Sequence, residues 1–177
     1  MHTSSTPLPP GYTHVQHTFE PVFDEHSRIL ILGSFPSVKS RENQFYYGHP
    51  QNRFWKLMAQ LLEVPVPQSI DEKKTMLLTH GLALWDVIAS CDIKRSSDSS
   101  IKNAVPADIS HILNAADIQT IITNGGTAFR LYGRYCEPLT GRPAVLCPST
   151  SPANAAFSLD RLAECWKPVM EPVIARL

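Results

Sequence analysis

The chain has 177 residues, of which 43% are hydrophobic and 18% are charged, and 16 basic and 16 acidic residues give it a formal net charge of zero. This length fits one domain with a single substantial core. The neutral balance argues against a protein that coats nucleic acid non-specifically, and no apolar run approaches the roughly 20 residues that cross a bilayer. We therefore expect a cytoplasmic protein with no membrane partner.

The N-terminal stretch "MHTSSTPLPPGY" is polar and rich in proline. It has neither the basic start nor the apolar run of a secretory signal. We expect residues 1–14 to form a flexible tail and residues 15–177 to form a single domain.

The first half of that domain alternates between strand and helix patterns. "RILILG" (residues 28–33) is a short apolar run that ends in glycine, as is typical of a buried parallel strand. Residues 52–64 carry apolar side chains at helical spacing. A second helix is predicted over residues 69–81, with Ser69 as its N-cap, and a second strand over residues 82–88.

The second half begins with a polar, serine-rich stretch, residues 91–103, that we predict to be a loop. The alternation then resumes with helices predicted over 107–117, 127–136 and 158–177 (the last bent at Pro168), and strands over 118–126 and 143–148.

This alternation predicts an α/β fold, a three-layer α/β/α sandwich around a four-stranded, mainly parallel sheet. Ligands of such folds lie at the carboxyl ends of the strands. Four segments with chemically useful side chains are expected there: "GSFPS", "WDV", "TNGG" and "PSTSPAN".

Several common chemistries do not fit these segments. "GSFPSVKS" lacks the glycines of a phosphate-binding loop, and neither "GSFPS" nor "CPSTSP" has the G-x-S-x-G spacing of a serine hydrolase. The four cysteines form no C-x-x-C pair and the histidines lack metal-ligand spacing, so we expect buried free thiols, no metal and no cofactor.

Three polar or aromatic residues leave two interpretations open. Tyr47 lies in a loop, where an aromatic ring could stack on a flat ligand or join the core. Asn52 could orient a water molecule or could cap the helix that follows it. Asn124 precedes two glycines and could contact a ligand or simply form a turn.

The combination of "GSFPSVKS", "YYGHPQNRFW" and "PSTSPAN" resembles the uracil-DNA glycosylase superfamily, from about Arg28 onward. "HPQNRFW" is similar to the mismatch-specific uracil/thymine branch. That branch, however, carries its catalytic Asn at the third position of the glycine loop, where Phe35 stands here. The hypoxanthine-DNA (deoxyinosine) glycosylase branch also lacks that Asn and is the branch that this chain resembles most.

The resemblance implies a role for each segment. Asn52 would be catalytic and would fix the attacking water. The base would be bound by Gly33, Ser34, Phe35, Tyr47, Asp86 and Asn124, and the DNA by Ser37, Ser149, Thr150, Ser151, Pro152 and Asn154. An ionised Asp86 would accept from the N1–H of hypoxanthine and repel adenine, although a residue that caps a turn at the strand end explains Asp86 equally well.

The implied function is that of a base-excision-repair enzyme that flips a deaminated base, above all hypoxanthine, out of damaged or mismatched DNA. It would hydrolyse the N-glycosidic bond and leave an abasic site; no lysine is singled out as a Schiff-base nucleophile, so we expect a monofunctional, monomeric enzyme. The alternatives are a G:T/U mismatch-specific glycosylase, an inactive DNA-binding module on the same fold and an unrelated small-molecule hydrolase. Single-stranded DNA is a further open partner.

Overall fold

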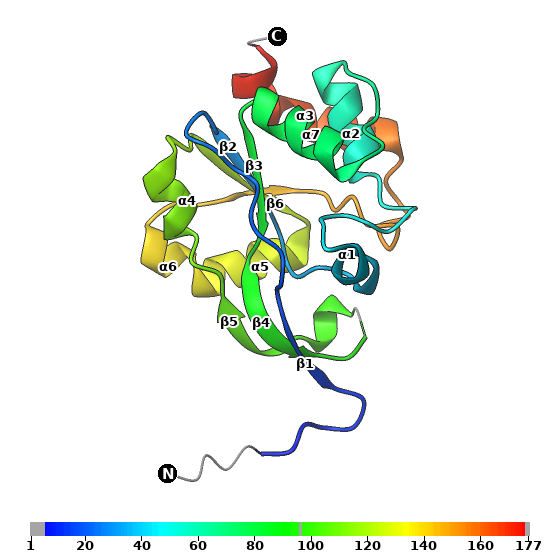
Figure 1. The fold of residues 1–177 in the computed structure, drawn as a ribbon, viewed down its shortest axis with the longest axis vertical. Coiled ribbons are helices and arrows are strands. Elements are labelled where there is room, and N and C mark those ends of the chain that lie inside the picture. Colours follow the sequence, from blue (N-terminus) through cyan, green and yellow to red (C-terminus); the bar gives the residue numbers. More distant parts are fainter. Residues whose placement is uncertain (1–5, 96, 176–177) are drawn as a thin grey trace.

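The computed structural model describes residues 6–95 and 97–175. Its centre is a parallel sheet in the order β3-β2-β6-β7 (Figure 1). The strands are β2 (Ile29–Gly33), β3 (Leu82–Asp86), β6 (Thr120–Asn124) and β7 (Val145–Cys147). All four strands were predicted from short apolar runs, and every pairing between them is parallel.

One face of this sheet packs against three helices, α2 (Phe54–Leu62), α3 (Ile70–Thr79) and α7 (Leu159–Ile174). Ile29 and Ile31 of β2 point into this half of the core, where they meet Leu57, Met58 and Trp166. Ser69 caps α3 as predicted, because its side chain accepts a hydrogen bond from the Glu72 N–H.

The other face packs against α4 (Ser110–Ala115) and α5 (Gly126–Tyr135), and the short, unburied α6 (Glu137–Thr140) follows α5. Leu30 and Leu32, the alternate residues of β2, point into this half. Because both faces of the parallel sheet are covered by helices, the predicted three-layer α/β/α sandwich is confirmed.

A second sheet, of three antiparallel strands, corrects both ends of the predicted loop over residues 91–103, because β4 includes residues 91–93 and β5 includes residues 102–103. Its order is β1-β4-β5, with β1 (Thr13–Gln16), β4 (Ile88–Ile93) and β5 (Lys102–Pro106). The prediction failed at its C-terminal end because β5 is largely exposed and begins with the polar residues Lys102 and Asn103, so its sequence lacks the alternation of a half-buried strand.

The same sheet shortens the expected N-terminal tail of residues 1–14. Thr13 and His14 already belong to β1, where they pair with Ile93 and Asp92 of β4. Residues 1–5 lie outside the described part of the chain. The predicted C-terminal end of the tail, residue 14, was therefore two residues too late. Residues 13 and 14 are ordered because they pair with a distant strand, although their own sequence has no strand pattern.

Two short helices lie beside the carboxyl ends of β2 and β3. Helix α1 (Val38–Asn43) follows the β2 loop, and the 3-10 turn η1 (Asp98–Ser100) lies in the β4–β5 connection.

No described helix is long and apolar enough to cross a membrane. Three of the four cysteines are buried as expected, whereas Cys165 is exposed. No group of three possible metal ligands occurs within residues 6–95 and 97–175.

Candidate active site

A cavity of about 520 Å³ opens at the carboxyl ends of β2, β3 and β6. Every site residue predicted from the sequence lines this cavity except Asn154. Their convergence follows from the topology, because parallel strands bring the loops that follow them to one edge of the sheet.

Gly33 and Asp86 are neighbours on the floor of the cavity because β2 and β3 pair in that register. A Cβ added to Gly33 would lie 2.3 Å from Asp86 Oδ1 and 3.1 Å from the Tyr47 hydroxyl. No real Cβ atom tolerates the first distance. The glycine therefore makes room for the carboxylate and the phenol to approach the same point.

The Asp86 carboxylate is held by a histidine that the sequence analysis did not identify. His17 Nε2 lies 2.8 Å from Asp86 Oδ2, and both side chains are only 5% exposed. The His17 ring is surrounded by Phe19, Phe35 and Tyr46. Oδ2 is thus committed to His17, whereas Oδ1 lies against Gly33 and makes no hydrogen bond with any described residue.

Tyr47 lies with one ring face against Phe54, at a centroid distance of 4.2 Å. Only its other face is available to a ligand. Its φ of 51° lies in the left-handed region, which costs a tyrosine about 1 kcal/mol or more. Burial and the nearby Asp86 carboxylate raise the pKa of its hydroxyl, which therefore keeps its proton. That buried oxygen has no hydrogen-bond partner of normal geometry among the described residues, although Asn124 lies close enough to lower the pKa somewhat.

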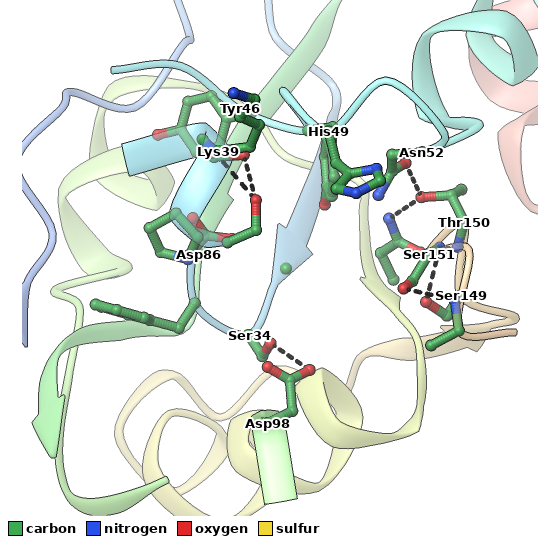
Figure 2. A pocket seen from close by; sticks show the side chains of 18 of the residues that line it. Ser34, Lys39, Tyr46, His49, Asn52, Asp86, Asp98, Ser149, Thr150 and Ser151 are labelled. Carbon is green, nitrogen blue, oxygen red and sulfur yellow. Dashed lines mark hydrogen bonds between the residues drawn. The ribbon is translucent and has the colours of Figure 1, made fainter. Parts of the chain in front are cut away.

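A second carboxyl group enters the cavity from η1. Asp98 Oδ2 accepts a hydrogen bond of 2.9 Å from the Ser34 hydroxyl (Figure 2). Burial raises the pKa of the Asp98 carboxyl, and the neighbouring Asp86 carboxylate raises it further, whereas Ser34 and Arg130 act in the opposite direction. Asp98 belongs to the segment 91–103 that was predicted to be a loop, and nothing in that segment indicated that its carboxyl group would enter the cavity.

Phe35 occupies the position at which the mismatch-specific branch carries its catalytic Asn. Its ring is 7% exposed and meets the His17 ring edge to face. It belongs to the core cluster on the α5 side of the sheet. The N–H groups of Ser34 and Phe35 have no hydrogen-bond partner among the described residues, so this turn can still donate to a ligand.

The opposite side of the cavity is built from neutral amides and hydroxyls (Figure 2). Asn124 Nδ2 donates to Thr150 Oγ1 over 3.0 Å, and Thr150 Oγ1 donates to Asn52 Oδ1 over 2.9 Å. Asn52 Oδ1 also accepts from the Phe54 N–H over 3.0 Å. Asn52 therefore does act at the start of α2, and its Oδ1 is saturated, which leaves the Nδ2 group as the end free to meet a ligand or water.

This chain of hydrogen bonds changes the expected roles of two residues. The sequence analysis predicted that Thr150 binds DNA. Thr150 is fully buried, however, so its side chain cannot contact a DNA phosphate. Instead it fixes the orientation of Asn52. Asn124 uses both ends of its amide on Thr150, because Oδ1 also accepts from the Thr150 N–H.

Arg53 holds the loop that contains Ser149–Pro152. Its guanidinium donates to the carbonyl oxygens of Ser151, Asn154 and Phe157, and its backbone N–H donates to the Thr150 carbonyl. Together with the hydrogen bonds of Thr150 to Asn124 and Asn52, the Arg53 side chain holds the loop against the cavity. Arg53 is consequently engaged with the protein rather than available to DNA.

The remaining predicted DNA contacts divide into two groups. Ser149, Ser151 and Pro152 are partly exposed at the cavity rim, where a phosphate could reach them. Ser37 caps α1 by accepting from the Ser40 N–H, and Asn154 lies outside the cavity and donates to the Ser149 carbonyl. The side chains of Ser37 and Asn154 thus already have partners within the protein. The Ser149 and Ser151 hydroxyls also accept from backbone N–H groups, but as O–H donors they can still bind a phosphate oxygen.

Sequence reasoning did not single out His17, His49, Arg53 or Asp98 as site residues, although three of them lie in segments that it discussed. Arg53 and His49 belong to "GHPQNRFW" and could have been considered there. His17 and Asp98 gave no local signal. Each is joined to a residue that lines the cavity by a hydrogen bond that spans more than 60 positions of the chain.

The profile of the uracil DNA glycosylase superfamily matches residues 20–169 of this chain. The chain belongs to the uracil DNA glycosylase superfamily. It is 36% identical to a hypoxanthine DNA glycosylase of Methanosarcina acetivorans over 160 residues, which are 88% of this chain and 98% of that relative. It is 34% identical to a hypoxanthine DNA glycosylase of Methanosarcina barkeri over 110 residues, 60% of this chain and 69% of the relative.

Structural comparison agrees with this assignment to the glycosylase superfamily. A solution NMR structure of a candidate uracil DNA glycosylase from Methanosarcina acetivorans aligns with a TM-score of 0.75 and 32% identity, covering 88% of this chain and 96% of that one. The family makes the protein a hydrolase that acts on N-glycosyl bonds, with DNA as its substrate.

Proposed function

We propose that this glycosylase releases hypoxanthine from deoxyinosine in DNA and leaves an abasic site, as the names of its two relatives suggest. The observation that carries the proposal is the Asp86 carboxylate on the floor of the cavity, with Oδ2 bound to His17 and Oδ1 unpartnered. Hypoxanthine presents an N1–H that can donate to Oδ1. Adenine presents a lone pair at that position and would be repelled.

The rest of the cavity suits a flipped purine. The free face of Tyr47 can stack on the base, which contributes about 1–3 kcal/mol in comparable single-strand complexes. The unpartnered N–H groups of Ser34 and Phe35 can donate to the base carbonyl. Ser149, Ser151 and Pro152 lie at the rim, where they can contact the phosphates beside the flipped nucleotide.

Asn52 is the residue proposed to place the attacking water. Because its Oδ1 already accepts from Thr150 and Phe54, the Nδ2 group is the part that can hold the water, by donating to its oxygen. In this arrangement Asn52 orients the water without removing its proton. An oriented water supplies the proximity that the hydrolysis needs.

A second substrate class is compatible with the same carboxylate. Uracil and thymine also carry a ring N–H, at N3, that could donate to Asp86 Oδ1, whereas cytosine presents a bare acceptor there. The carboxylate therefore disfavours adenine and cytosine but accepts any base with a ring N–H at this edge, guanine included, and the preference for hypoxanthine is the part of the proposal that rests on the relatives. We further propose that the protein acts as a monomer on duplex DNA.

The test is single-turnover base release from duplexes that carry hypoxanthine, uracil or thymine opposite each normal base, and from the matching single strands. Asn52→Ala is measured alongside, with Asn114→Ala as a control because Asn114 is exposed on α4, away from the cavity. Hypoxanthine release that is lost in Asn52→Ala alone supports the proposal. Release of uracil or thymine without hypoxanthine would refute the substrate, and normal release by Asn52→Ala would leave Asn52 as a helix cap.

A further inference from the structure

We propose that Asp98 is a catalytic residue of this glycosylase, the general acid that protonates the base as its bond to the sugar breaks. This inference rests on the proposed function, in which a base is hydrolysed from DNA in the cavity of the Gly33 loop. It adds a step for which neither the family profile nor the names of the relatives assign a residue.

The geometry leaves one oxygen of Asp98 ready to carry a proton. Oδ2 accepts from the Ser34 hydroxyl over 2.9 Å, so a proton on the carboxyl group resides on Oδ1. Oδ1 has no hydrogen-bond partner among the described residues. Asp98 lines the same cavity as Asp86 (Figure 2), and Tyr47 lines that cavity as well. An O–H donor is thus available where the base would lie.

Burial, and after it the nearby Asp86 carboxylate, favours the protonated form of Asp98 by raising its pKa. Asp86 on β3 faces it as a like charge, Arg130 on α5 as an opposite charge, and Cys91 on β4 and Tyr47 are the other titratable groups that interact with it. No described cation forms an ion pair with Asp98. Burial and Asp86 together raise the pKa of the carboxyl group above its ordinary value.

Asp86 and Asp98 therefore suit opposite tasks in one cavity. Asp86 is bound by a buried histidine and offers an acceptor, whereas Asp98 is bound only by a neutral hydroxyl and has a raised pKa. Two carboxyl groups whose surroundings differ in this way are the usual basis for dividing acceptor and acid roles.

The reaction itself calls for such an acid. As the C1′–N9 bond breaks, its electron pair moves to the purine, and an anionic base would face the Asp86 carboxylate at short range. If Asp98 Oδ1 gives its proton to a basic ring nitrogen such as N7, the base leaves uncharged. Water forms the new bond to C1′ and loses its proton to solvent, and Asp98 takes a proton back from solvent.

The experiment compares the wild-type protein with Asp98→Asn in single-turnover hypoxanthine release from pH 5 to pH 9. Asp117→Asn is the matched control, because Asp117 is exposed outside the cavity. Loss of a general acid typically slows a reaction about 100-fold to 10,000-fold. We expect Asp98→Asn to be slower by at least about 100-fold. We also expect it to lack the fall in rate at high pH that the wild type shows as Asp98 ionises.

Two further readouts separate catalysis from structure. Binding to uncleaved hypoxanthine DNA should stay within about threefold of the wild type, since a general acid acts on the transition state rather than on binding. On DNA carrying 7-methylhypoxanthine, whose alkylated N7 lets it leave neutral without protonation, the wild type and Asp98→Asn should release the base at similar rates.

The proposal is overturned if Asp98→Asn releases hypoxanthine at the wild-type rate, keeps the wild-type pH profile at a lower rate, or loses binding in proportion to rate. If the wild type releases a base other than hypoxanthine, the proposed substrate fails. The same variants assayed on that base still decide the role of Asp98.

Discussion

The cavity has two walls that are built on different principles. The acidic wall, formed by Gly33, Ser34, Asp86 and Asp98 with His17 behind it, carries the two carboxyl groups. The amide wall, formed by Asn52, Asn124, Thr150 and the Ser149–Pro152 loop held by Arg53, carries only neutral hydrogen-bonding groups at its surface.

Hydrogen-bond saturation also separates the walls. On the acidic wall, each carboxyl group has one oxygen that is hydrogen-bonded and one that has no partner within the described part of the chain. On the amide wall, Asn52 Oδ1 and both ends of Asn124 are occupied by protein donors and acceptors. The first wall is thus suited to read and protonate a base, and the second to hold a water and a backbone in fixed positions.

Replacing the acceptor of the acidic wall should have the largest effect. In Asp86→Asn the carboxylate becomes an amide, which can present an N–H to the bare N1 of adenine. We expect the preference for hypoxanthine over adenine to fall by about 1,000-fold, since unpaired polar groups carry discrimination of that scale. The single-turnover release rates of hypoxanthine and adenine measure this preference. A preference that is unchanged in Asp86→Asn would show that Asp86 only caps a turn.

Replacing Arg53, which holds the loop of the amide wall, should have the second largest effect on the release rate. Arg53→Lys loses the planar fork that reaches three carbonyl oxygens, and we expect a loss of about 2 kcal/mol in loop closure, or about 30-fold in release rate. Arg134→Lys is the control, because Arg134 is exposed on α5 and stacks only on Tyr135. Equal rates in both variants would mean that the Ser149–Pro152 loop holds its shape without Arg53.

Removing the Thr150 hydroxyl, which joins the Asn52 and Asn124 amides, should slow base release by a smaller factor. Thr150→Val keeps the volume but removes the hydroxyl that joins Asn124 to Asn52, so the Asn52 amide loses one of its two anchors. We expect release to slow about tenfold, the effect of one neutral hydrogen bond, whereas Thr150→Ser stays close to the wild type. Equal rates for Thr150→Val and Thr150→Ser would contradict the orienting role of Thr150.

The smallest effect concerns stability rather than rate. The pKa of Asp98 is raised in the folded protein, so the folded state holds this proton more tightly than the unfolded state, and stability falls as pH rises through the folded pKa. At pH 7 Asp98→Asn should therefore be more stable than the wild type by about 1 kcal/mol, the scale of one poorly compensated polar group.

Urea unfolding at pH 7 and at pH 4 measures this difference, which should shrink at the lower pH. A less stable Asp98→Asn protein at pH 7 would mean that Asp98 serves chiefly to fasten η1 to the Gly33 loop.

Local sequence patterns were sufficient for the parallel sheet and its helices. Apolar runs such as "RILI" mark strands buried on both faces, and the Ser69 cap marks a helix start, because both depend on residues near one another in the chain. The same patterns missed β1, β4 and β5, whose pairing is decided between distant segments.

The candidate site divides in the same way. The motifs around Gly33, Asn52 and Ser149 were enough to bring the resemblance to light, and together with Asp86 and Asn124 they supplied 12 of the 22 residues that line the cavity. Only the tertiary structure decided what their side chains do. His17 meets Asp86, Asp98 meets Ser34, and Thr150 meets Asn52, each across more than 60 positions of the chain. Burial and hydrogen-bond saturation arise from such contacts, and no local pattern encodes them.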